Sequence, residues 1–265
     1  CKTSLWIYDL GGSKIRTGQV AVAMTGETEK QPTVSVIIPT LNGAQWLMKL
    51  LAGLREQTLV PVEIVVVDSG STDETCAIAR AHDVHLLEIN RRDFDHGGTR
   101  TMAARQATGD ILVYMTQDAV PAARDVLALL VLPFAGDTTI AATYGRQLAT
   151  EDAGFFAAHL RLVNYPDHSQ VRCWKDRSQW GFKTIFISNS FAAYRRDVLA
   201  AHGYFPERVL FGEDTLTLAK LLESGYCVEY VADACVYHSH NSTIWQDFKC
   251  YFDIGVFHAD QSEQL

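Results

Sequence analysis

Short apolar runs alternate with helical segments from Thr33 onward, and this alternation constrains the fold more than any other feature of the chain. Val34–Pro39, Glu63–Asp68 and Ile111–Met115 are rich in β-branched residues and end at turn-forming or polar residues, which predicts buried strands. Between the first two runs, Ala44–Gln57 repeats its leucines at helical spacing. Such alternation predicts an α/β fold, with a mostly parallel sheet that helices cover on both faces.

The same patterns place the remaining elements, although residues 150–185 show no clear period. Further strands are expected at His85–Ile89, Ile140–Tyr144, Phe186–Tyr194, Cys227–Val231 and Ala234–His238. Further helices are expected at Asp73–His82, from Arg100 to Thr108, after Pro121, at Asp197–His202 and at Glu213–Ser224. Residues 1–32 are Gly- and Thr-rich over much of their length, without a sustained period, and are interpreted as an N-terminal extension.

Composition limits the classes of partner. The net charge of −8 argues against nucleic acid, because binding to phosphates needs a basic surface. No apolar run approaches the ~20 residues that span a bilayer, which predicts a cytoplasmic protein. The six cysteines form no C-x-x-C pair and are expected to be reduced thiols.

Small polar residues, glycines and acids follow the predicted strands. Four strands are followed by such segments, namely Pro39–Gly43, Asp68–Asp73, the loop Arg91–Arg100 and Thr116–Ala119. Ligands of open α/β sheets bind at the carboxyl ends of the strands, so these segments predict a nucleotide site. Neither G-x-G-x-x-G nor G-x-x-x-x-G-K-[ST] occurs, so a divalent cation held by carboxylates is the expected partner of the phosphates, with Asp118 as its ligand. Arg91, Arg92 and Asp93 are expected only on a solvated loop face.

The ordered motifs resemble those of the inverting family 2 glycosyltransferases, which have the GT-A fold. They are IIPTLNG (residues 37–43), VVVDSGSTD (65–73), GGTR (97–100), TGDILVYMTQDA (108–119) and GEDTL (212–216). FDHGGTR (94–100), SNS (188–190), FGED (211–214) and VYHSH (236–240) resemble the bacterial rhamnosyltransferase branch of that family. The resemblance spans Val34–His258. It implies a nucleotide-binding half (33–120) and an acceptor and catalytic half (121–258), with 259–265 beginning a further C-terminal region.

The resemblance also implies roles for single residues on the donor side. Pro39, Thr40, Asp68, Arg100 and Gln117 would bind the nucleotide, and the Asp68 carboxylate would accept from a pyrimidine N–H. Arg100 would stand just ahead of a helix. Mg²⁺ or Mn²⁺ would be held by Asp118, His238 and His240. Thr116 stands where the family's D-x-D motif usually has its first acid, which leaves one protein carboxylate there.

On the acceptor side, Asp214 matches the family's catalytic base and Glu213 precedes it, while Asn189 and Trp180 are expected near the acceptor. The implied reaction moves a sugar from a dTDP- or UDP-sugar, with L-rhamnose from dTDP-rhamnose favoured. The acceptor would be a glycan or lipid-linked glycan of bacterial polysaccharide or O-antigen synthesis. Such an enzyme could associate peripherally with the inner face of the cell membrane. Two alternatives are a nucleotidyltransferase, and a non-catalytic module that binds sugar nucleotides or glycans.

Overall fold

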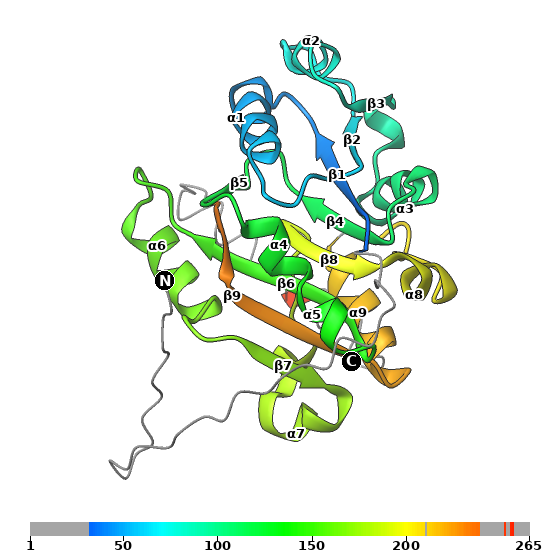
Figure 1. The fold of residues 1–265 in the computed structure, drawn as a ribbon, viewed down its shortest axis with the longest axis vertical. Coiled ribbons are helices and arrows are strands. Elements are labelled where there is room, and N and C mark those ends of the chain that lie inside the picture. The colour runs from blue at the N-terminus through cyan, green and yellow to red at the C-terminus, as the bar shows by residue number, and fades with distance from the viewer. Residues whose placement is uncertain (1–31, 210, 239–251, 253–254, 257–265) are drawn as a thin grey trace, which may run out of the picture. The chain divides into compact units, whose positions relative to one another are not determined.

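A computed structural model describes residues 32–209, 211–238, 252, 255 and 256. The chain divides into two compact units, residues 1–31 and 32–265, and all described residues belong to the second. His240 therefore lies outside the described part of the chain. The predicted alternation of strands and helices is present from β1 to β4 and less regular after it (Figure 1).

Nine strands of the described residues form one sheet, in the order β3-β2-β1-β4-β8-β6-β9-β5, with β7 also paired to β9. Its first part is parallel and consists of β1 (Val34–Thr40), β2 (Glu63–Asp68), β3 (His85–Glu88) and β4 (Ile111–Met115). All four therefore point their carboxyl ends to the same edge, as the sequence predicted.

The second part of the sheet is mixed. β8 (Phe191–Arg195) runs antiparallel between β4 and β6 (Ile140–Leu148). β9 (Cys227–Tyr237) runs parallel to β6 and antiparallel to β5 (Val120–Pro121) and β7 (Gln170–Cys173). The two strands predicted at 227–238 are thus one strand, whose register against β6 shifts between Gly145 and Arg146. Ala232–Ala234 have no partner on β6 in that interval, which accounts for the break in the sequence pattern.

Helices cover both faces of the sheet. The α-helices are α1 (Ala44–Arg55), α2 (Thr75–Arg80), α3 (His96–Gln106), α4 (Val126–Val131), α5 (Pro133–Gly136), α6 (Phe155–Asn164), α7 (Arg177–Trp180), α8 (Arg196–Ala201) and α9 (Glu213–Glu223). Short 3₁₀ helices lie at Arg91–Asp93, Trp174–Asp176 and Gly181–Ile185. None of the helices described is long and apolar enough to cross a membrane.

Alternate residues of the strands pack into two separate hydrophobic cores. Val36 and Ile38 of β1 pack in the same cluster as the leucines of α1 and α4. Ile37, between them, belongs to a cluster that includes apolar residues of α3 and α9. Successive side chains of a strand point to opposite faces, so a fully apolar strand such as β1 requires cover on both.

Helix α3 begins four residues earlier than predicted, at His96 rather than Arg100. Asp95 caps it, and its side chain accepts a hydrogen bond from the Gly98 amide at 2.6 Å. The two glycines at the start discouraged a helical prediction because glycine has a low helix propensity. Arg100 therefore lies inside the helix.

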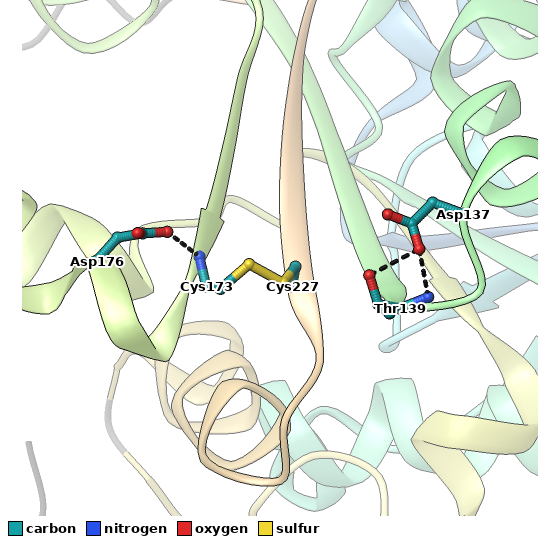
Figure 2. Close-up of a disulfide and its surroundings, with 5 residues drawn as sticks. All are labelled: Asp137, Thr139, Cys173, Asp176 and Cys227. Carbon is teal, nitrogen blue, oxygen red and sulfur yellow. Dashed lines mark hydrogen bonds between the residues drawn. A yellow bond between two sulfur atoms is a disulfide. The ribbon is translucent and has the colours of Figure 1, made fainter.

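The expectation of reduced thiols is wrong for one pair, because Cys173 and Cys227 form a disulfide (Figure 2). These residues end β7 and begin β9, and antiparallel pairing sets them directly opposite each other with a Cα–Cα distance of 4.4 Å. Their sequence separation of 54 carries no sign of this pairing. Cys76 and Cys235 are free.

Candidate active site

A cavity of about 490 Å³ opens at the carboxyl ends of β1, β2 and β4. Six of the predicted site residues line it, namely Pro39, Thr40, Arg100, Gln117, Asp118 and His238. Leu41, Ser69, Arg91, Phe94, His96, Thr116 and Ser190 line it as well. The site thus lies at the sheet edge where the strand-end motifs predicted it.

Five predicted residues of the described part of the chain do not line this cavity. Glu213, Asp214 and Asn189 form a cluster beside it, described below, and the Asp68 carboxylate turns into its own loop. Trp180 lies at the end of α7, partly exposed, and is not part of the cavity wall either. Its predicted role against the acceptor stays a prediction.

Arg91, Phe94 and His96 are lining residues that the sequence interpretation missed. Arg91 was expected only on a solvated loop face; it is exposed, yet it lines the cavity next to the β2 loop. Phe94 and His96 pack edge to face with ring centroids 4.9 Å apart. The loop itself was predicted at this edge of the sheet, but its sequence did not indicate which of its side chains besides Arg100 would line the cavity.

Gln117 organises the end of β1. Its side-chain oxygen accepts from the Thr40 hydroxyl at 2.5 Å and from the Leu41 amide at 3.0 Å, while its amide donates to the Leu41 carbonyl at 3.2 Å. Gly43 is required beside it, since a Cβ there would overlap the Gln117 side chain. Gln117 thus shapes the cavity wall, and its predicted contact with a nucleotide stays a prediction.

Asp68 is buried and shapes the loop after β2. Its carboxylate accepts from the amides of Gly70 and Ser71, each at 2.9 Å, and from the Ser71 hydroxyl. Gly70 has a φ of 85°, which glycine adopts without steric strain. These bonds fix the shape of the β2 loop, and a contact between Asp68 and a pyrimidine ring stays a prediction.

Three buried polar atoms of the cavity-lining residues have no hydrogen-bond partner: Ser69 Oγ, Thr116 Oγ1 and Arg100 Nε. An unsatisfied buried polar group costs about 1–3 kcal/mol, so such groups are retained where a ligand can satisfy them. Two hydroxyls and a guanidinium suit the hydroxyl and phosphate oxygens of a nucleotide sugar.

Asp118 and His238 lie side by side in the cavity wall, with Asp118 Oδ1 3.4 Å from His238 Nε2. His238 follows β9 directly, and its Nδ1 lies 2.9 Å from the side-chain oxygen of Gln147. Because an amide oxygen only accepts, Nδ1 donates to Gln147, and this bond turns Nε2 toward Asp118. A carboxylate and an imidazole oriented by a second hydrogen bond form a donor pair that fits a divalent cation. No cluster of three or more His, Cys, Asp or Glu side chains suited to a metal occurs among the described residues.

Glu213 and Asp214 begin α9, as predicted, and are held by buried partners. Glu213 Oε1 lies 3.3 Å from Arg100 Nη1, with both side chains less than a tenth exposed, and 3.4 Å from the side-chain amide of Asn189. Asp214 accepts from the backbone amides of Asn189 at 3.1 Å and Thr215 at 2.8 Å. Tyr194 donates to the Asn189 side-chain oxygen at 2.9 Å, which orients this residue. Asn189 therefore touches both carboxylates.

Burial, followed by the negative charge of Glu213, raises the pKa of Asp214 to about 6. Asp214 as a whole residue is partly exposed. A carboxylate with a raised pKa is a stronger base than an ordinary aspartate and is still ionised at neutral pH. Two adjacent carboxyls in different environments, one paired with arginine and one not, are typical of an acid–base site.

A sheet whose parallel part carries this site at its carboxyl edge defines an α/β enzyme that handles a nucleotide derivative. Residues 35–203 match the model of the family described as "Glycosyl transferase family 2", and the chain belongs to that family. It is therefore a glycosyltransferase with the GT-A fold that the motifs implied.

Relatives in two Salmonella strains support this membership. The chain is 43% identical to O-antigen chain rhamnosyltransferase RfbN of Salmonella typhimurium (strain LT2), over 85% of this chain and 72% of that protein. It is 40% identical to O-antigen chain rhamnosyltransferase WbaN of Salmonella anatum, over 86% and 73% of the two chains.

Among solved structures, the chain resembles mannosyltransferase PcManGT from Pyrobaculum calidifontis in complex with GDP-Man and Mn²⁺. The TM-score is 0.60 at 27% identity, and the match covers 83% of this chain and 60% of that one.

Proposed function

We propose that this glycosyltransferase transfers L-rhamnose from dTDP-L-rhamnose, with inversion, to a glycan or lipid-linked glycan of bacterial O-antigen synthesis. The observation that carries the choice of sugar is the 43% identity to a rhamnosyltransferase over most of the chain. The raised pKa of Asp214, beside the cavity, supports inversion by a single base. Membership of the glycosyltransferase family favours this function over a nucleotidyltransferase or a binding module.

Asp214 is the base in the proposed reaction. The acceptor hydroxyl oxygen attacks the anomeric carbon, the bond from that carbon to the diphosphate oxygen breaks, and Asp214 takes the hydroxyl proton. The amides of Asn189 and Thr215 hold the carboxylate in place during the attack. Glu213, which is paired with Arg100, contributes negative charge that raises the pKa of Asp214, and the positive charge of Arg100 opposes that shift.

Asp118 and His238 are the residues that would hold Mg²⁺ or Mn²⁺, and His240 is a further predicted ligand outside the described residues. When bound, the cation would supply positive charge to the leaving nucleoside diphosphate. Gln147 orients His238 for this role through the bond to Nδ1. Because Thr116 replaces an acid, the protein contributes few anionic ligands, and the diphosphate itself would complete the coordination.

The donor side of the cavity is proposed to bind the nucleoside between the β1 end and the β2 loop. Thr40 and Ser69 come from these two segments, and Arg91 lies beside the second. Arg100 lines the same cavity with an unsatisfied Nε. We place the enzyme in the cytoplasm, where it would meet a lipid-linked acceptor at the inner membrane face.

A transfer assay with a panel of nucleotide sugars tests this function. The purified chain, Mn²⁺ and a rhamnose-terminated or undecaprenyl-linked acceptor are incubated with dTDP-L-rhamnose, UDP-glucose, UDP-GlcNAc and GDP-mannose, and the products are identified by mass spectrometry and NMR. We expect transfer from dTDP-L-rhamnose and a product of inverted anomeric configuration. Exclusive use of another donor would overturn the choice of sugar, and a retained configuration would overturn the single-base mechanism.

A further inference from the structure

The first turn of α3 is fastened to the segment that leads into α9. The link is the Asp95 carboxylate, which caps α3 through Oδ2 and accepts from the Arg208 backbone amide through Oδ1 at 2.9 Å. One side chain thus supplies hydrogen-bond acceptors to two segments that are more than a hundred residues apart in the sequence.

Two further contacts join the same segments. The Thr101 hydroxyl accepts from the Phe205 amide at 3.2 Å and lies 3.4 Å from the Phe205 carbonyl oxygen. Pro206 lies directly on Gly97, where a Cβ would overlap the Pro206 carbonyl oxygen. Residues 205–208 therefore follow the surface of α3 closely.

Arg208 has a φ of 60°, a left-handed conformation that is unfavourable for a residue with a side chain. Such a conformation persists only where surrounding contacts enforce it, and the bond to Asp95 is a contact of that kind. The Asp95 carboxylate thus holds a strained turn five residues ahead of Glu213.

Helix α3 also touches the donor cavity. His96 and Arg100 line the cavity, and Arg100 forms the ion pair with Glu213 at the start of α9. Helix α3 therefore lines the cavity, contacts residues 205–208 and is paired with the start of α9. The position of Asp214 relative to the donor cavity therefore depends on the contacts between α3 and the segment that precedes α9.

We propose that Asp95 is a positioning residue for glycosyl transfer: by capping α3 and holding the Arg208 amide, its carboxylate fixes Asp214 with respect to the donor cavity. The inference rests on the proposed role of Asp214 as the base. It requires two acceptor oxygens in one side chain, which neither serine nor asparagine provides.

The variants Asp95→Ser and Asp95→Asn test the inference, because each keeps an oxygen that can cap α3 and removes the second acceptor. We measure kcat, donor KM, the affinity for dTDP by calorimetry, and the pH dependence of kcat. We expect kcat to fall about 10- to 100-fold, since small misplacements of reacting groups have effects of this size. Donor KM and dTDP affinity are expected to stay within about 3-fold, and the acid limb of the kcat profile to shift.

Glu63→Ala is the matched control. Glu63 also joins separate segments through one carboxylate, accepting from Ser35 and Thr108, but at the opposite end of β2. It is expected to lower the melting temperature without changing kcat or its pH profile. An equal loss of kcat in Glu63→Ala and Asp95→Ser would reduce Asp95 to a merely structural residue and overturn the inference.

Two other outcomes would also overturn it. An unchanged kcat in both Asp95 variants would show that the link to Arg208 is irrelevant to transfer, and a parallel loss of kcat and dTDP affinity would assign Asp95 to the donor cavity alone. Asp214→Asn in the same assay separates this failure from that of the proposed function. If Asp214→Asn kept its turnover, the base assignment itself would be wrong.

Discussion

The loops that follow β2 and β4 and the region around α9 and the end of β9 hold their polar site residues in different ways. After the parallel strands, Gln117 and Asp68 are satisfied by hydrogen bonds to nearby backbone and hydroxyl groups, which fix the shape of two loops. Around α9 and the end of β9, ionisable side chains face each other instead. Glu213 is paired with Arg100, and Asp118 faces His238.

The loops held by Gln117 and Asp68 thus give the cavity its shape, whereas the region around α9 and the end of β9 supplies its ionisable groups. Loops fixed by local hydrogen bonds can present the same surface over a wide pH range. Ionisable groups in a low-dielectric setting interact strongly and respond to pH and to bound ions. Dependence of the reaction on pH and metal should therefore arise in the second region, and the following predictions test that division.

The largest effect is expected for Asp214→Asn, which removes the base. We predict that kcat falls by about 10²- to 10⁴-fold, while the affinity for the nucleoside diphosphate changes less than about 3-fold. Asp197→Asn is a matched control, since Asp197 also lies in the first turn of a helix and accepts from the next amide at 2.8 Å. Steady-state kinetics and calorimetry measure both variants. Near-normal turnover of Asp214→Asn would contradict the assignment of the chemical step to the region around α9.

A smaller effect is expected when the cation site is disrupted. We predict that Asp118→Ala, or EDTA added to the wild type, lowers kcat/KM by about 10²-fold, because the diphosphate loses its compensating positive charge. Gln147→Leu, which leaves the His238 ring without its Nδ1 partner, should weaken Mn²⁺ binding by about 10-fold. Mn²⁺ titrations of activity measure both effects. Full activity in EDTA would contradict the assigned role of Asp118.

A still smaller effect is expected from acid. Asp214 must be ionised to accept a proton, so kcat should fall about 10-fold per unit as the pH drops below about 6. The folded pKa lies above the ordinary value of 3.8, so the folded chain binds this proton more tightly than the unfolded chain. The contribution of Asp214 to the free energy of unfolding therefore increases as the pH falls. Unfolding driven by protonation of Asp214 thus does not explain the loss of kcat.

The pH profile of Glu213→Gln sharpens this test. Removing the neighbouring negative charge lowers the pKa of Asp214, so the acid limb should move to lower pH. A limb that stayed in place would mean that another group titrates in that range.

The smallest effect on transfer is expected for the disulfide, which joins β7 to β9 away from the cavity. Cys173→Ser should reduce the free energy of unfolding under oxidising conditions by about 2–4 kcal/mol, because the cross-link restricts the unfolded chain. Turnover should change less than about 2-fold. Thermal unfolding with and without dithiothreitol measures the difference in stability between the wild type and Cys173→Ser. This difference should vanish when the wild type is reduced. A large loss of kcat on reduction of the disulfide would show that the β7–β9 region contributes to the active site.

Sequence patterns predicted the parallel part of the site well. The bounds of β2 and β4 agree with the predicted strands, and the strand-end residues Pro39, Thr40, Gln117 and Asp118 line the cavity. These predictions depend only on local periodicity and on the rule that parallel strands end at one edge. The polar loop before α3 was harder, because its glycines mask a capped helix start.

By itself, the sequence determined the α/β class, the family and the ordered set of site segments, because each of these follows from short-range patterns. Only the tertiary structure decided which side chains meet across long separations. It paired Arg100 with Glu213, Gln147 with His238, and Cys173 with Cys227, and it placed Arg91 and His96 in the cavity wall. Such contacts arise where the mixed strands and α9 fold against the parallel half, and local periodicity carries no information about that packing.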